Sequence, residues 1–176
     1  MKPPDDDPLW VTVERRYADK PKRLARARAL REKLAETAER TGWNPDNGAL
    51  PHYDREGRAI SLAAWAVLFE DFRYKRIARS KVPGGWVSTV WLGLDHRYGL
   101  LDRGTQAPII FETMAFWSPS DDCRTMDRYA TEAEALAGHR RIVAQLRAEA
   151  KTLDATLERS GLPAGLLERR PTVDQP

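Results

Sequence analysis

Apolar residues in the last third of the chain recur at alternating steps of three and four, which places them on one face of a helix. Thr131 and Glu134 have the spacing of a capping box, and Gly161 suits the end of the helix. The pattern predicts a long helix over about residues 131–160. His139 lies on the apolar face, where we expect a buried histidine whose ring nitrogens are satisfied. The other members of this face are Leu136, Val143, Leu146, Ala150, Leu153 and Leu157.

Four shorter segments in the first half of the chain carry further structural signals. Leu24, Ala27, Leu30, Leu34 and Ala38 share one helical face, and Pro21 fits the first turn, so a helix is predicted from residue 20 to a stop at Gly42. Ser61 is a good N-cap for a helix that buries the side carrying Leu62, Trp65, Leu68, Phe69 and Phe72. Residues 10–17 are interpreted as a short strand or a segment anchored by Trp10, and residues 74–80 as a short basic helical turn.

The strongest strand signals are residues 86–94 and 109–117, which are rich in Val, Thr and Trp. The fourteen residues between them contain no crossover helix, so we predict an antiparallel hairpin with a long tip. Alternation along the strand puts Trp86 and Trp91 on opposite faces. Residues 52–60 predict a smaller hairpin, and residues 128–129 a short edge strand. Together these elements indicate an α+β fold with a small antiparallel sheet.

The length of 176 residues suits one domain, which we place at residues 9–168 between polar tails at 1–8 and 169–176. A helix of about thirty residues is longer than a small sheet. Its distal half is therefore expected to pack on the first helix or on a second copy of the chain, as a homodimer.

The single cysteine, Cys123, excludes an internal disulfide framework and a multi-cysteine zinc site. It fits a reducing compartment. We expect no signal peptide, and no apolar run is long enough to cross a bilayer, so the sequence predicts a cytoplasmic protein that is not embedded in a membrane. No cofactor signature is present, and we expect neither a cofactor nor a metal.

Positive charge is concentrated in two segments, residues 14–33 and 73–81, although the net charge of the chain is only +3. If they share one face, they form a surface for nucleic acid or for an acidic protein. Tyr74 lies between the charges and is a candidate for stacking on a base. The alternative is a solvated helix face whose arginines pair with Glu32, Glu36 and Glu39. The candidate basic residues are Arg23, Arg26, Arg28, Arg31, Arg73, Lys75, Arg76, Arg79 and Lys81.

A small enzyme is the runner-up interpretation. Asp95 and His96 follow the first long strand, and Glu112 lies in the strand that returns past it. These residues can converge as a metal site or as a histidine–glutamate acid–base pair. The spacing is not diagnostic, and the alternative is that Asp95-His96 caps a loop while Glu112 faces solvent or pairs with an arginine.

Three motifs resemble a family of small uncharacterised proteins from actinobacteria, their phages and prophages: STVWLGLDH at residues 88–96, FETMAF at 111–116, and RYAT followed by EA and GH across 128–139. With the segment at 53–65, the resemblance spans about residues 52–146. It carries no activity and no site residue. It favours an accessory protein, in the host cytoplasm if phage-encoded, and we hypothesise a non-catalytic protein that binds a macromolecule through a basic helical face.

Overall fold

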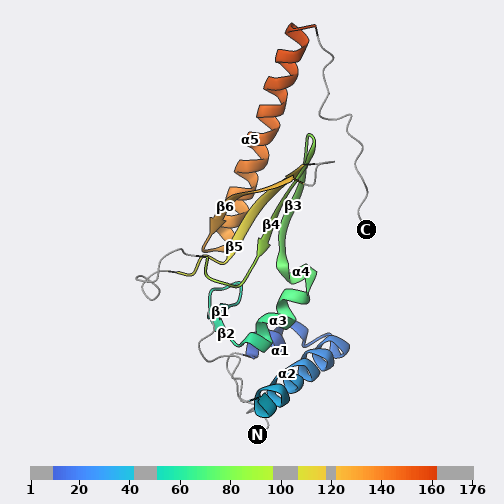
Figure 1. Ribbon diagram of the computed structural model, residues 1–176, viewed down its shortest axis with the longest axis vertical. Coiled ribbons are helices and arrows are strands. Elements are labelled where there is room, and N and C mark those ends of the chain that lie inside the picture. Colours follow the sequence, from blue (N-terminus) through green and yellow to red (C-terminus); the bar gives the residue numbers. More distant parts are fainter. Residues whose placement is uncertain (1–9, 42–50, 97–106, 118–121, 162–176) are drawn as a thin grey trace. The chain divides into compact units, whose positions relative to one another are not determined.

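The computed structural model describes residues 10–41, 51–96, 107–117 and 122–161 and has an α+β fold (Figure 1). Its contacts group the chain into two compact units. Unit 1 contains the described residues up to Lys75 together with those of Leu92–Ile110, and unit 2 contains Arg76–Trp91 and the described residues from Phe111 onward. The single domain at 9–168 stays a prediction, and the two tails lie outside the described residues.

Unit 2 is a four-stranded antiparallel sheet in the order β3-β4-β5-β6. Its strands are β3 (Arg76–Val82), β4 (Gly85–Trp91), β5 (Phe111–Trp117) and β6 (Asp122–Tyr129). Pairing of β4 with β5, in which Thr89 lies opposite Thr113, confirms the predicted central hairpin. The long tip of that hairpin lies mostly outside the described residues.

One prediction about the flanking strands was wrong. Of the helical turn predicted at 74–80, only Tyr74 and Lys75 are helical, in the one turn of α4 (Phe72–Lys75), and residues 76–82 form edge strand β3. Gly84 has a φ of 77°, so Pro83-Gly84 can make a tight turn that pairs Val82 with Gly85. The edge strand predicted at residues 128–129 is confirmed: these residues end β6, which lies at the other edge of the sheet and has eight residues.

Helix α5 (Glu132–Arg159) packs along one face of this sheet and extends beyond it (Figure 1). The capping box is present: Glu134 N donates to Thr131 Oγ1 at 3.2 Å, and Thr131 N donates to Glu134 Oε2 at 3.0 Å. Both the helix and its cap were predicted. Leu153, in the distal half, is 43% exposed, and the homodimer stays a prediction. The core beneath α5 is formed by Val82, Val87, Ala115, Ile142, Val143 and Leu146.

Unit 1 contains α1 (Val11–Tyr17), α2 (Pro21–Thr41) and α3 (Leu62–Glu70), besides α4. It also holds the two-stranded sheet of β1 (His52–Tyr53) and β2 (Ala59–Ile60). The small hairpin and the helix after Pro21 were predicted, as was the Ser61 cap, whose Oγ accepts from Ala64 N at 3.3 Å. Of the two interpretations of residues 10–17, the strand was wrong, because Trp10, Val13 and Tyr17 follow steps of three and four and form one buried helical face. Trp10 is 3% exposed, which agrees with the alternative of a segment anchored by this residue.

Two buried aspartates organise unit 1. Asp71 accepts a hydrogen bond from the Tyr17 hydroxyl at 3.0 Å and forms ion pairs with Arg23 and Arg16 at 3.0 and 3.5 Å. It therefore connects α1 and α2 to the junction of α3 and α4. Asp54 is fully buried and accepts from Glu56 N and Arg58 N inside the β1–β2 turn. Several basic side chains of unit 1 are therefore paired with buried carboxylates that stabilise its fold.

Burial alone would raise the pKa of Asp71, but hydrogen bonds from Tyr17 and Arg23 outweigh it and hold that pKa below its ordinary value of 3.8. Burial and the bond to Asp71 raise the pKa of Tyr17 to about 12. The stabilisation from ionised Asp71 is thus present above about pH 3.8 and is lost as the pH falls through the lower folded-state pKa.

Asp71→Asn should lower the free energy of unfolding by about 2 kcal/mol, because it weakens charge-assisted hydrogen bonds at a buried position. Urea unfolding at neutral pH measures this change. Asp19→Asn is the matched control, since the Asp19 side chain is 77% exposed and pairs with Lys20 at 3.4 Å. It should change stability by less than about 0.5 kcal/mol. Equal effects of the two substitutions would contradict the role given to Asp71.

Candidate functional site

The β3–β6 sheet has one face turned toward α5 and one face turned away from it. Antiparallel partners share a face, so the printed register sorts the side chains. Val82, Val87 and Ala115 lie toward α5, where they form the core. The opposite face, which we name the open face, carries Arg76, Arg79, Lys81, Trp86, Ser88, Val90, Glu112, Met114, Phe116, Cys123 and Arg128.

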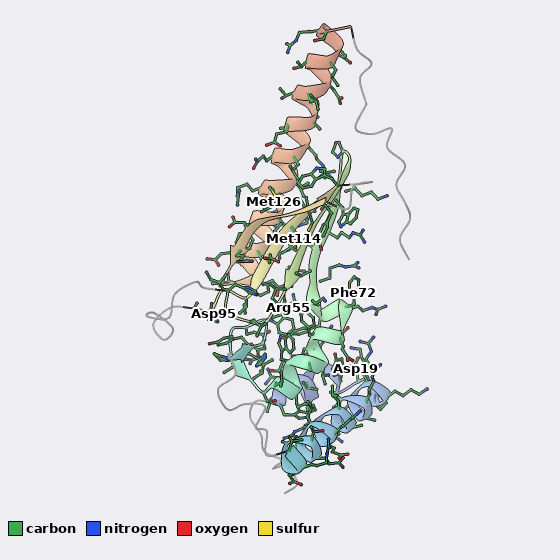
Figure 2. The ribbon with its side chains drawn as sticks, viewed as in Figure 1. Asp19, Arg55, Phe72, Asp95, Met114 and Met126 are labelled. Atoms are coloured by element: carbon green, nitrogen blue, oxygen red, sulfur yellow. The ribbon has the colours of Figure 1, made fainter. Side chains whose placement is uncertain are left out.

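In the described part of unit 2, α5 is the only helix, so the open face has no helix of that unit over it. The tryptophans of β4 show the difference between the two faces. Trp91, on the α5 side, is fully buried, whereas Trp86 on the open face is half-buried. This confirms the predicted opposite orientation of Trp86 and Trp91. Figure 2 labels two methionines on neighbouring strands of this sheet: Met114 of β5 belongs to the open face, and Met126 of β6 packs against the α5 core.

Three cations line the β3 edge of the open face. In a regular strand, Arg76 would point away from the face that holds Arg79 and Lys81, because side chains alternate. A bulge between Arg76 and Ala78 shifts the register, so that Arg76 lies opposite Val90 and Arg79 opposite Ser88. All three therefore share one face. Arg79 and Lys81 are exposed, and neither pairs with a carboxylate among the described residues.

Next to these cations lies a pair of aromatic rings. Trp86 and Phe116 are direct cross-strand partners, with ring centroids 5.2 Å apart and an interplanar angle of 11°. The guanidinium of Arg79 lies 5.1 Å from the Trp86 ring centroid. A parallel aromatic pair and a cation over a ring are each worth about 1 kcal/mol, so these three groups hold one another in place.

On the part of the open face formed by β5 and β6, the charge of an arginine is balanced by a carboxylate. Arg128 Nε donates to Glu112 Oε1 at 2.8 Å, and Glu112 is 8% exposed. The sequence pattern predicted that Glu112 could converge with Asp95 and His96 as an acid–base or metal site. Asp95 instead accepts from Ile109 N at 3.0 Å in unit 1, and His96 N donates to the Ile109 carbonyl at 3.0 Å. Among the described residues, no group of three His, Cys, Asp or Glu is arranged to hold a metal ion.

The basic face predicted on α2 is mostly used inside unit 1. Arg23 pairs with Asp71, Arg26 with Glu70 at 3.3 Å, and Arg28 with Glu14 at 2.8 Å. These are not the partners within the helix that the sequence suggested. Arg31 lies over the Trp10 ring at 4.8 Å. The partners of these arginines are therefore already present in the fold.

Residues 73–75 also belong to unit 1. Arg73 is exposed and, with Arg23 and Arg26, lines a cavity of about 350 Å³. Lys75 Nζ lies 4.0 Å from the Phe69 ring centroid. Tyr74 is 6% exposed, and its hydroxyl accepts from Arg55 N at 3.0 Å, so its ring is not available for the predicted stacking on a base. Burial raises the pKa of Tyr74.

A buried polar chain lies beneath α5. Both ring nitrogens of His139 are bonded, as expected: Nε2 to Ser80 Oγ and Nδ1 to Thr89 Oγ1, each at 2.9 Å. Thr89 Oγ1 in turn lies 2.7 Å from Thr113 Oγ1. In a serine hydrolase, one ring nitrogen of the histidine faces the serine and the other is bonded to a carboxylate that stabilises the charged imidazole. Here the second nitrogen, His139 Nδ1, is bonded to the Thr89 hydroxyl instead. We therefore assign a structural role to this series of hydrogen bonds, which joins α5 to the sheet.

The aromatic pair and its position beside the cations were not predicted from the sequence. The available signal was the alternation of basic and small or apolar residues from Ala78 to Val82, followed by Pro83-Gly84-Gly85. That pattern predicts a strand and a tight turn into the next strand.

Comparison of the chain with protein-family models, curated proteins and solved structures finds no match. The resemblance to small actinobacterial and phage proteins stays a prediction. None of the described helices is both long enough and apolar enough to span a bilayer.

The pKa of His139 should lie below its ordinary value of 6.5, because burial and the neighbouring charge of Arg140 disfavour the imidazolium. Its stabilising contribution is complete above about pH 6.5 and is lost as the pH falls through the lower folded-state pKa. An NMR titration of the His139 ring carbons measures this pKa. A value at or above 6.5 would contradict the buried hydrogen-bond chain.

Proposed function

We propose that the protein binds nucleic acid through the open face of the β3–β6 sheet. The observation that carries the proposal is the bulge in β3, which brings Arg76, Arg79 and Lys81 to the same face as the Trp86–Phe116 pair. Across the open face, the described residues include four basic side chains and one carboxylate, Glu112. An excess of cations attracts phosphates, and planar rings bind bases.

The proposed binding surface is a face of the sheet, whereas the sequence predicted a basic helical face that included α2. A phosphate that approached Arg23 would compete with Asp71, which is 6% exposed and needs its cationic partners. Arg79 and Lys81 lose no carboxylate partner within the described residues when they bind an anion. The cost of recruiting cations is therefore lower on β3 than on α2.

An acidic protein surface is the other partner class that the charge admits. The aromatic pair favours nucleic acid, because bases offer flat faces to Trp86 and Phe116 while aspartate and glutamate do not. The enzyme hypothesis with Asp95, His96 and Glu112 stays a prediction, and no contact among the described residues favours it over binding.

Neutralising β3 should weaken binding to nucleic acid and reduce its dependence on salt. Each of Arg79→Gln and Lys81→Gln should lower the steepness of log affinity against log salt by about 1, because one phosphate contact is lost. Fluorescence anisotropy with a labelled oligonucleotide at several salt concentrations measures both quantities. The control is Lys151→Gln, which removes an exposed lysine of the same unit from α5 and should leave both unchanged.

Two results would contradict the proposal. The first is no binding of the wild-type protein to single-stranded or duplex oligonucleotides even at low salt, and the second is an equal effect of Lys151→Gln and Lys81→Gln. If wild-type protein binds polyglutamate but neither form of nucleic acid, the open face recognises an acidic protein instead.

A further inference from the structure

We infer that the nucleic acid bound here is a single strand whose bases stack on the Trp86–Phe116 pair. The inference rests on the proposed function and narrows its ligand class. It concerns the aromatic rings rather than the cations, so the two claims can fail separately.

The row of planar groups runs from the sheet edge toward its centre: Arg79 on β3, Trp86 on β4 and Phe116 on β5. Beyond Phe116, its partner on β6 is Cys123, an exposed free thiol with a small side chain. One side of the Phe116 ring is therefore occupied by Trp86, and the side toward β6 is bordered by a small residue. A flat base can extend the row at this end.

A second position for a base is at Trp86. The Arg79 guanidinium over that ring is held by a cation–π contact of about 1 kcal/mol at an exposed site. Stacking of a base on an aromatic ring is worth about 1–3 kcal/mol. Once the base has displaced the Arg79 guanidinium from the Trp86 ring, Arg79 can pair with a phosphate. Replacement of Arg79 by a base therefore exchanges a weak contact for two stronger ones.

Spacing across the sheet matches a strand of nucleic acid that crosses the β-strands. Neighbouring strands are about 5 Å apart, so the cations of β3 lie one spacing from Trp86 and two, about 10 Å, from Phe116. A nucleic-acid strand that runs in this direction can place a phosphate at the cations of β3 and its bases at Trp86 and Phe116. In a duplex the faces of the bases are covered by their neighbours, so only an unpaired strand can use these rings.

The experiment compares labelled single-stranded DNA and RNA with the duplex of the same sequence, using wild-type protein and ring variants. The wild type should bind the single strands more tightly than the duplex. Trp86→Ala and Phe116→Leu should each weaken single-strand binding by about 5- to 100-fold and leave the salt dependence unchanged, because the cations remain. Trp86→Phe retains a ring and should stay within a few-fold of wild type.

Phe72→Ala is the matched control, since Phe72 is an aromatic residue of unit 1 that is 58% exposed. It should not alter affinity. Far-ultraviolet circular dichroism and thermal unfolding show whether each variant is folded, and Phe116→Leu keeps apolar volume if Trp86→Ala does not fold. Duplex binding that equals or exceeds single-strand binding, with folded ring variants unaffected, would overturn the inference and leave the proposed function standing. Absence of binding to every oligonucleotide would remove both.

Discussion

Side chains alternate between the two faces of the β3–β6 sheet, and α5 packs against one of these faces. This constraint divides the residues of each strand into two groups with different roles. Val87, Thr89 and Trp91 are buried on the α5 side, while Trp86 and Ser88 are half-buried on the open face. The bulge in β3 adds Arg76 to the open face. The site is therefore a consequence of register and not of any contiguous motif.

Basic residues have two different roles in this chain. On α2, Arg23, Arg26 and Arg28 pair with carboxylates of other elements of unit 1, and Asp71 lies at the junction of its helices. Those of β3 lie on an edge strand, where Arg147 of α5 donates to the Lys81 carbonyl at 3.0 Å. Cations on an edge strand also discourage pairing with another sheet. The aromatic pair beside them has no part in that protection, and it is what favours nucleic acid as the partner.

The long helix and the central hairpin could be predicted because their signals are local: a capping box at Thr131, a repeated apolar face, and β-branched runs without a crossover. Edge strand β3 was not predicted, because it has few apolar residues and its basic residues were interpreted as part of a short basic helical turn. The partners of Arg23 and Arg28 lie on other elements, at Asp71 and Glu14, so no helical spacing could reveal them. The stacking of Trp86 on Phe116 depends on register, and the bulge that unites the cations leaves no sequence signal.

The indole N–H signals of Trp86 and Trp91 distinguish the two faces of the sheet, because the two residues lie on one strand and point to opposite faces. An NMR titration of the wild-type protein with a single-stranded oligonucleotide should shift the Trp86 signal progressively, while the signal of fully buried Trp91 stays in place. Shifts that leave Trp86 unchanged and fall on the amides of α2 would contradict the assignment of binding to the open face.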